Sequence, residues 1–341
     1  MYIKKLIAIM FAFALTAAGY QFASPTVTAS SNELAVLLPE SDGVVVLDSK
    51  RLVVEALPQI LASNLPMLEK VNGEIDKIKT KTGLDLREFD QVAVGLKNKG
   101  TDKAEFDAVL LARGNVSVES LKGVAEIASR GNFRTVKYGS RDIHVFSPDE
   151  LIKDNKPGRG SWIDTIVSKL FGDLSKEVAI TAYDSKTVAF GSLERVKQTI
   201  GNSPRISNDI LGLLDRKSGS LANGGMKVPT GMSQYLDLED DELGNNLNSI
   251  RFLQGSLEVN DGVTSVSIAA RTIETAQAEE LAATVNAISG MFAGILKKNK
   301  SADKQVYGRM LESIAVTQVE NEIFVDLTVP KSDLDVLIGK K

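Results

Sequence analysis

Two unlike sets of side chains alternate along residues 178–183: Val178, Ile180 and Ala182 on one side and Ala179, Thr181 and Tyr183 on the other, which is typical of a strand with two unlike faces. The polar residues 184–186 then supply a turn, and residues 187–190 return as a second strand. Ser192 is a suitable cap for a helix that follows. The stretch therefore predicts a hairpin followed by an amphipathic helix, whose apolar face carries Leu193, Val196 and Ile200.

The same order of hairpin and helix recurs along the chain. In the C-terminal part, strands flank Asn260-Asp261-Gly262, a strong hairpin-turn signal. A long helix is predicted from about Ala276, with an apolar stripe made of Leu281, Val285, Ile288, Phe292 and Ile295. Hairpin-helix patterns lie near residues 91–128, 178–200, 255–296 and 314–338, which suggests two related α+β halves.

The N-terminal half begins with an apolar run, Gly43 to Leu47, that predicts a buried strand. A helical region follows; Pro58 is expected to interrupt it, Pro66 to start a fresh helix and Gly83 to end that helix. Further strands are predicted at 91–96, 106–113, 136–138 and 143–146, with a helix from about Ser117. This order predicts an α+β fold with a split β-α-β-like first half, in which antiparallel sheets carry helices on one face and the 178–190 hairpin extends the sheet.

Composition shifts between Gly201 and Met232, where small and polar residues cluster after a short predicted helix at 210–214. Such a shift is typical of a domain boundary. The predicted organisation is a signal peptide at 1–29, a first α+β domain at 30–205, a linker with a short helix at 206–248 and a second α+β domain at 249–341. Residues 147–161 are interpreted as a loop excursion, and residues 162–171 as a helix.

The N-terminal segment has the layout of a secretory signal peptide. Lys4 and Lys5 precede the uncharged apolar run Leu6 to Gly19, and a small-residue site permits cleavage between Ala29 and Ser30. The alternative is an uncleaved anchor, but the apolar run is shorter than the roughly 20 residues that a spanning helix needs. We expect an exported protein, periplasmic or extracellular after cleavage, with no transmembrane span in the mature chain.

Composition narrows the function classes further. The chain has 341 residues, of which 43% are hydrophobic and 25% are charged, as in ordinary globular proteins. It has no cysteine, which excludes disulfides, thiolate catalysis and cysteine-ligated metals. Removal of Lys4 and Lys5 lowers the basic residues from 40 to 38 against 44 acids, a net charge of −6. Without a large basic patch, nucleic acid is not an expected partner.

Few residues offer catalytic chemistry. His144 is the only histidine and lies between two apolar residues in a predicted strand, where a structural role is expected. A Ser-His-Asp site would need this imidazole as its base, no G-x-S-x-G motif presents a serine, and a usual zinc site needs more ligands. Ser301 to Lys304 matches S-x-x-K and Lys81 to Gly83 matches K-T-G, but in reversed order for a penicillin-interacting serine enzyme.

Two further motifs fail on inspection. Asp237, Glu239 and Asp241 are spaced like calcium-loop ligands, yet Glu242 stands where the loop requires glycine, so a solvated loop is expected. Gly158-Arg159-Gly160 lacks the third glycine and the preceding strand of a dinucleotide fingerprint. No catalytic, cofactor-binding or metal-binding residues are therefore assigned, and no cofactor is expected.

The stretches LLPESDGVVVLDSKRL (37–52), KTGLDLREFDQVAVGL (81–96) and TVAFGSLERVKQTI (187–200) resemble a loose group of uncharacterised exported bacterial proteins. The resemblance extends over most of the mature chain and rests on turn glycines, strand alternation and a helix stop. It implies export and an α+β fold. It transfers no activity and no functional residues.

Three functions are consistent with these observations. The first is an exported non-enzymatic protein that binds a protein partner or an envelope component. The second is a carrier of a lipid or other apolar ligand, with Ile288, Met291, Phe292 and Ile295 on the cavity wall. The third is a carboxylate-based hydrolase, for which the many acids of the chain single out no particular pair.

Overall fold

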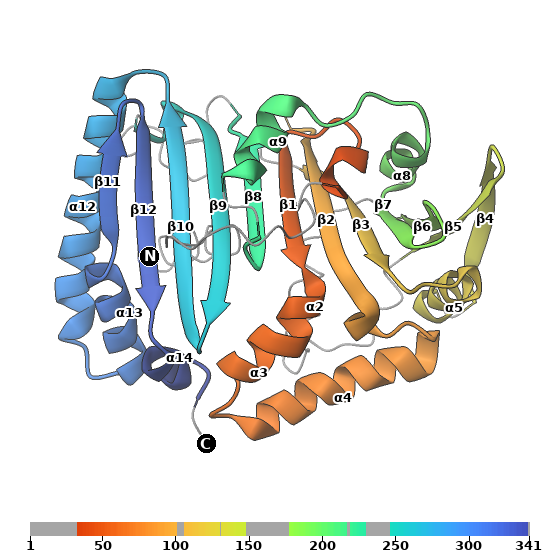
Figure 1. Cartoon of the computed structure of the whole chain (residues 1–341), viewed down its shortest axis with the longest axis horizontal. Helices are drawn as coiled ribbons and strands as arrows, with labels where there is room; N and C mark the ends of the chain where they lie inside the picture. The colour runs from red at the N-terminus through yellow and green to blue at the C-terminus, as the bar shows by residue number, and fades with distance from the viewer. Residues whose placement is uncertain are drawn as a thin grey trace. The chain divides into compact units, whose positions relative to one another are not determined.

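The computed structural model describes residues 33–100, 106–129, 131–147, 177–216, 219–229 and 246–339 (Figure 1). These residues form two compact units. Unit 1 comprises the described residues of Arg51–Lys70 and Asp209–Lys341, and unit 2 comprises those of Asn32–Lys50 and Val71–Asn208. Each unit is an antiparallel sheet with packed helices, which confirms the predicted α+β class.

The sheet of unit 2 has the strand order β1-β2-β3-β7-β6-β5-β4, and each neighbouring pair is antiparallel. The predicted strands are all present, each within a few residues of its expected ends. Their bounds are β1 (Gly43–Asp48), β2 (Phe89–Asn98), β3 (Phe106–Gly114), β4 (Phe133–Tyr138), β5 (Arg141–Phe146), β6 (Val178–Ala182) and β7 (Thr187–Gly191).

The strand order corrects one part of the prediction. In a split β-α-β unit, the two strands that the helix connects are separated in the sheet by another strand. Here β1 and β2 are direct antiparallel neighbours, although helices separate them in sequence. The β6–β7 hairpin also does not extend the sheet; it lies inside it, with β7 on β3 and β6 on β5. Local pattern predicts the elements, whereas contacts between distant segments choose their order.

The helices of unit 2 pack around the hairpin. Helix α5 contacts β5 and β6, and α8 contacts β3, β6 and β7. The core beneath α5 consists of Leu121, Ala125, Phe146, Val178, Ile180 and Val188. The helical elements are η1 (Ala35–Leu37), η3 (Leu86–Glu88), α5 (Val118–Ala128) and α8 (Leu193–Ile200), and α4 (Leu65–Thr82) ends in this unit at Gly83, whose φ of 75° suits glycine.

The sheet of unit 1 has the order β11-β12-β10-β9-β8, again antiparallel throughout. Its strands are β8 (Ala222–Lys227), β9 (Ile250–Asn260), β10 (Val263–Thr272), β11 (Ala315–Val319) and β12 (Glu322–Val329). Its helices are η2 (Leu52–Ala56), α3 (Leu57–Ile60), α9 (Asn208–Asp215), α12 (Thr275–Lys297), α13 (Ala302–Glu312) and α14 (Lys331–Leu337), with α2 (Ser49–Arg51) just before η2.

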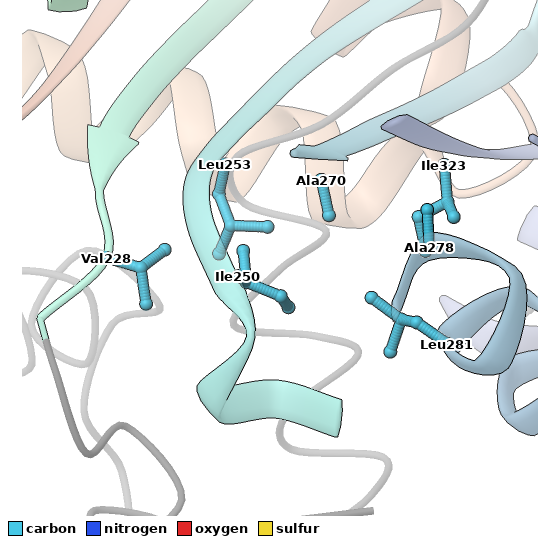
Figure 2. Close-up of a cluster of buried hydrophobic side chains, with 7 residues drawn as sticks. All are labelled: Val228, Ile250, Leu253, Ala270, Ala278, Leu281 and Ile323. Atoms are coloured by element: carbon cyan, nitrogen blue, oxygen red, sulfur yellow. The ribbon is translucent and has the colours of Figure 1, made fainter. Parts of the chain in front are cut away.

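Helix α12 lies on strands β10, β12 and β11 and contacts α13 (Figure 1). Figure 2 shows the core that its N-terminal half closes: Val228, Ile250, Leu253, Ala270, Ala278, Leu281 and Ile323. Leu281 is 2% exposed, and burial of such a side chain stabilises the fold by about 1.5–3 kcal/mol.

The predicted apolar stripe of α12 is wrong at its last member, Ile295. Ile295 is 52% exposed, whereas Ser289, Ala293 and Leu296 are buried. The helix is apolar around most of its circumference there, so period alone does not select the buried side. Helix α13 selects it instead: a Cβ on Gly308 would stand 2.8 Å from the Lys297 backbone nitrogen, so this glycine permits the close approach of the two helices.

The segment Arg51–Lys70 belongs to unit 1 although its neighbours in sequence belong to unit 2. Arg51 forms an ion pair with Glu258 at 2.7 Å, and Asn64 donates to the Ile338 carbonyl at 3.0 Å. Apolar residues of the segment also pack on β9 and on the start of β8, in a cluster of Leu52, Ala56, Ile60, Leu221, Leu257 and Val259.

Pro66 stands at the start of α4 as predicted, but Pro58 does not interrupt the earlier helix. The chain stays helical from α2 through α3, and the π-helical element η2 ends at Ala56, two residues before Pro58. A π-helical turn has backbone hydrogen bonds five residues apart instead of four, and this one lies close to a proline that has no backbone N–H to donate.

The residues between the two predicted domains also differ from expectation. The short helix is present as α9. Ala222–Lys227, expected to belong to a linker, is strand β8 and pairs with β9. A Cβ on Gly225 would stand 2.6 Å from Leu213 Cβ, so glycine lets α9 approach the strand. The glycine-rich composition thus reflects close packing here rather than a free connection.

Several sequence predictions lie outside the described residues: the signal peptide at 1–29, most of the loop at 147–161, the helix at 162–171 and the acidic run at 237–242. In the part of the chain that the structure describes, none of the helices combines the length and hydropathy needed to cross a membrane.

Candidate functional site

A buried polar cluster lies at the start of α8 in unit 2. Ser192 caps this helix as predicted, because its hydroxyl accepts the Arg195 backbone N–H at 3.3 Å. The same hydroxyl donates to Asp107 Oδ2 on β3 at 3.1 Å. The cap therefore connects the helix to the sheet and holds Asp107, which is 2% exposed, beside it.

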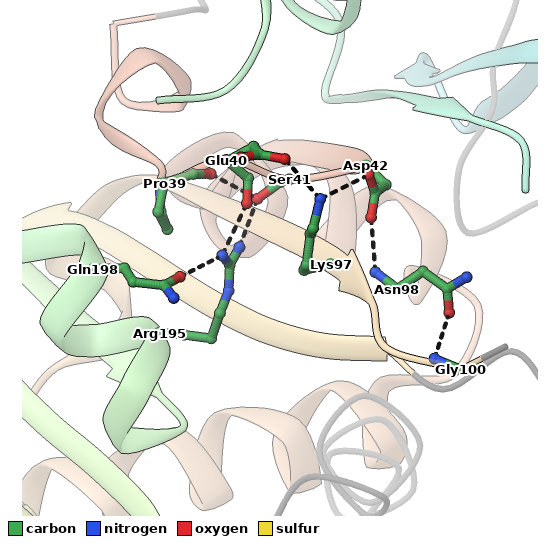
Figure 3. Close-up of polar contacts among 9 residues, drawn as sticks. All are labelled: Pro39, Glu40, Ser41, Asp42, Lys97, Asn98, Gly100, Arg195 and Gln198. Carbon is green, nitrogen blue, oxygen red and sulfur yellow. Dashed lines mark hydrogen bonds and ion pairs between the residues drawn. The ribbon is translucent and has the colours of Figure 1, made fainter. Parts of the chain in front are cut away.

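Arg195 is the central side chain of the cluster and is 3% exposed. Its guanidinium donates to the Glu40 carbonyl at 2.8 Å, to Ser41 Oγ at 2.7 Å and to Gln198 Oε1 at 2.9 Å (Figure 3). Burial lowers the pKa of Arg195, an effect that the neighbouring carboxylates oppose. An arginine side chain nevertheless keeps its charge in a protein, so the cluster contains a permanent buried cation.

The loop that Arg195 holds is tied down on its other side as well. Ser41 donates to the Pro39 carbonyl at 2.8 Å, and its Oγ stands 2.6 Å from the place that a Cβ on Gly95 would occupy. Arg205 donates to the Leu37 carbonyl at 2.8 Å. Residues 37–41 are thus held by two arginines from the segment 195–205, and Gly95 on β2 leaves room for the loop.

Lysines from the end of β2 meet the acids of the cluster. Lys97 donates to Glu40 at 2.8 Å and to Asp42 at 3.2 Å (Figure 3). The hydrogen bond to Glu40 is the main cause that raises the pKa of Lys97. Lys99 forms an ion pair with Asp107. Positive and negative groups therefore alternate around this site.

These side chains line a pocket of about 220 Å³. Its walls contain three cations, three carboxylates and three uncharged residues: Lys97, Lys99, Arg195, Glu40, Asp107, Glu194, Gln198, Ser203 and Pro204. Pockets for drug-sized ligands are usually about 300–1,000 Å³. This pocket is smaller and charged, so it suits a small polar group.

Two polar atoms of the pocket residues have no hydrogen-bond partner among the described residues. They are Asp107 Oδ1, an acceptor, and Arg195 Nε, a donor, and both are buried. Leaving such a group unsatisfied costs roughly 1–3 kcal/mol. These two atoms are the acceptor and the donor of the cluster that the described residues leave unsatisfied.

The sequence pattern did not identify Arg195. It assigned the buried face of α8 to Leu193, Val196 and Ile200, but the buried residues are Arg195, Val196 and Thr199. A charged side chain is normally assigned to solvent unless a partner is known. The partners here are carbonyl and hydroxyl oxygens some 155 positions earlier in the chain. No local signal in the sequence identifies them.

The residues that the sequence did single out lie elsewhere. His144 is buried on β5, where its Nδ1 is 3.2 Å from Thr135 Oγ1 and its ring meets Phe133 edge-on. Burial lowers the pKa of His144. These contacts fit the structural role expected for this histidine.

The S-x-x-K and K-T-G matches lie in different units. Ser301 is the residue before α13 in unit 1 and bonds to Asp303, whereas Lys81 to Gly83 end α4 in unit 2. Lys297 forms an ion pair with Glu312 at 2.7 Å. Across the described ranges, no group of three His, Cys, Asp or Glu residues is arranged to hold a metal ion.

Comparisons with known proteins do not assign this chain to a family. No protein-family model matches the chain, and no curated protein matches it. Among solved structures, crystal form III of TP0453 aligns with a TM-score of 0.45 and 9% identity, covering 92% of this chain and 99% of that chain. Crystal form IV of TP0453 aligns with a TM-score of 0.45 and 8% identity, covering 89% and 95%. These scores carry no inference about activity or ligand.

Proposed function

We propose that this chain is an exported, non-enzymatic binding protein, and that the pocket beside Arg195 receives a peptide group of a partner polypeptide. The observation that carries the proposal is the pair of buried unpartnered atoms, Asp107 Oδ1 and Arg195 Nε. The signal-peptide pattern of residues 1–29 supports export.

A peptide group matches this pair chemically. It has one N–H donor and one carbonyl acceptor, as Asp107 Oδ1 and Arg195 Nε require. The charges around the pocket balance, three against three, so the site favours neither a net anion nor a net cation. Its volume of about 220 Å³ also suits a short polar segment better than a lipid chain.

Photo-crosslinking of the exported chain tests the proposal. A benzophenone amino acid replaces Glu194, which is exposed at the pocket and belongs to its lining. We expect a covalent adduct with a polypeptide. In the same background, Ser203→Trp fills the pocket and should lower the adduct yield at least about fivefold, whereas Asn202→Trp, next in sequence but outside the lining, should leave the yield unchanged.

The outcomes separate the proposed function from its alternatives. No polypeptide adduct, or a yield that Ser203→Trp leaves unchanged, would contradict peptide binding at this pocket. The carboxylates Glu40, Asp107 and Glu194 line the same pocket and are the specific observation in favour of a hydrolase. Turnover in a broad hydrolase screen that Glu194→Gln abolishes would replace the binding proposal with that one.

The residues assigned to the wall of a lipid carrier do not surround a common space among the described residues. Met291 and Ile295 are exposed, and Phe292 packs with Ala293, Leu296 and Leu311 at the contact with α13. The carrier function stays a prediction. Its test is native mass spectrometry, in which a bound apolar ligand adds mass that denaturation removes.

A further inference from the structure

The outward face of α12 is a second surface with no part in the pocket. Glu280 and Lys297 bound a stretch with no charged residue between them. The side of the helix that faces away from the sheet and α13 exposes Met291 (56%) and Ile295 (52%). The exposed face also includes Ala283, Ala287, Gly290 and Gly294, with Asn286 as its polar member.

When a second α12 is placed antiparallel on this face, the large side chains of one copy lie opposite small side chains of the other. If two α12 helices lie antiparallel with a two-fold axis at the level of Ser289, Ile295 of one copy is level with Ala283 of the other. Met291 is then level with Ala287. Each of the two large apolar side chains thus meets a small one, which is what interdigitating helix packing requires.

The same two-fold axis also places the acidic end of one helix beside the basic end of the other. The axis that pairs Ile295 with Ala283 also brings Glu280 level with Lys298 of the second copy. Glu279, Glu280, Lys298 and Lys300 are all exposed. The charged ends lie 18 residues apart, about 27 Å along the helix, and they meet opposite charges only in the antiparallel arrangement.

We infer that a second copy of this chain docks on the outward face of α12, forming a two-fold symmetric antiparallel helix pair. A lipid surface fits the face less well. Helices that lie in a bilayer interface usually present Trp, Phe or Leu, with Lys or Arg along the polar side. This face offers two large apolar side chains, and its acidic end would be repelled by anionic lipid.

Engineered cysteines test the register, and the chain has no cysteine of its own to interfere. The full chain is prepared as Ala283→Cys and, separately, as Ile295→Cys. When the two preparations are mixed and oxidised, we expect a disulfide-linked dimer, because these positions face each other across the axis. A mixture of Ala283→Cys with Ala287→Cys is the control and should give at least about fivefold less product. Equal yields would contradict the proposed pairing.

Sedimentation velocity over about a hundredfold range of concentration tests the energetics. Met291→Ser with Ile295→Ser should weaken association about tenfold or more, whereas Ile273→Ser, at a residue 51% exposed outside the face, should not. Glu280→Lys and Lys298→Glu should each weaken association, and the double variant should restore it.

A chain that stays monomeric at every concentration would overturn the proposal. So would binding to anionic vesicles that depends on Met291 and Ile295 while the chain stays monomeric, because the occupant would then be lipid. The photo-crosslinking result at Glu194 is independent of both outcomes, since that residue lies in the other unit.

Discussion

Arg195 and Asp107 show how a buried charged residue can be built into a packed sheet-helix contact. Each is at most 3% exposed, yet each retains one polar atom without a partner among the described residues. Ser192 contacts both, as helix cap to one and hydroxyl donor to the other. These contacts hold both groups in place at the start of α8.

His144 gives a pH dependence that can be measured at the residue scale. Burial lowers its pKa from the ordinary 6.5, so the folded state favours the neutral ring. Its contribution to stability is fully present above pH 6.5 and is lost as the pH falls toward the folded pKa. Between about pH 7.5 and 5, we therefore expect the urea midpoint of His144→Gln to fall less than that of the unaltered chain. Parallel curves for the two proteins would contradict this assignment.

At the scale of elements, the local sequence determines the conformation of the β9–β10 hairpin turn, but it determines α12 only in part. The hairpin turn is determined locally, since Asp261 and Gly262 both have positive φ, 52° and 76°. Asn260-Asp261-Gly262 predicts such a turn directly. The helix is determined locally only in its existence and length, because its apolar residues cover too much of its circumference to select one buried side.

Gly262→Val should destabilise unit 1, because a β-branched residue with positive φ is strained by roughly 1–3 kcal/mol. Gly262→Asn is the matched control, since asparagine tolerates this conformation best among residues with a side chain. Both variants place a Cβ about 2.9 Å from Lys331 Cδ, the flexible part of a long side chain. We expect a clearly lower urea midpoint for Val than for Asn. Identical midpoints would mean that the turn conformation is not what stabilises the hairpin.

At the scale of the whole molecule, the two units are not successive stretches of sequence. The predicted first domain, 30–205, contains Arg51–Lys70, which packs in unit 1. The predicted boundary at 205 lies close to Asp209, where the chain enters unit 1 for its remaining length. Hydrogen bonds such as Gly262 N–H to Gln59 Oε1 at 3.1 Å connect the early segment to strands that come 200 residues later.

Export gives a prediction for the complete protein. Native mass spectrometry of full-length protein recovered from a bacterial envelope fraction should show a chain that starts near Ser30, because Val27-Thr28-Ala29 supplies a small-residue cleavage site. A mass that includes Met1 to Ala29 would contradict cleavage and would point to an uncleaved anchor. The same spectrum also tests for a carried ligand.

The sequence by itself determined most of the strands, most helix ends, the hairpin turns and the α+β class, because these follow from local periodicity, caps and turn residues. Its catalytic motifs are incomplete or contain disqualifying residues, and the structure gave His144 a structural place. Only the tertiary structure decided the strand order, the assignment of Arg51–Lys70, the buried side of α12 and the pocket at Arg195. Each depends on contacts between residues far apart in the chain, such as Arg195 with Glu40 and Ser41. The hydrophobic pattern of a segment predicts which of its side chains are buried, but it does not predict which distant segment covers them.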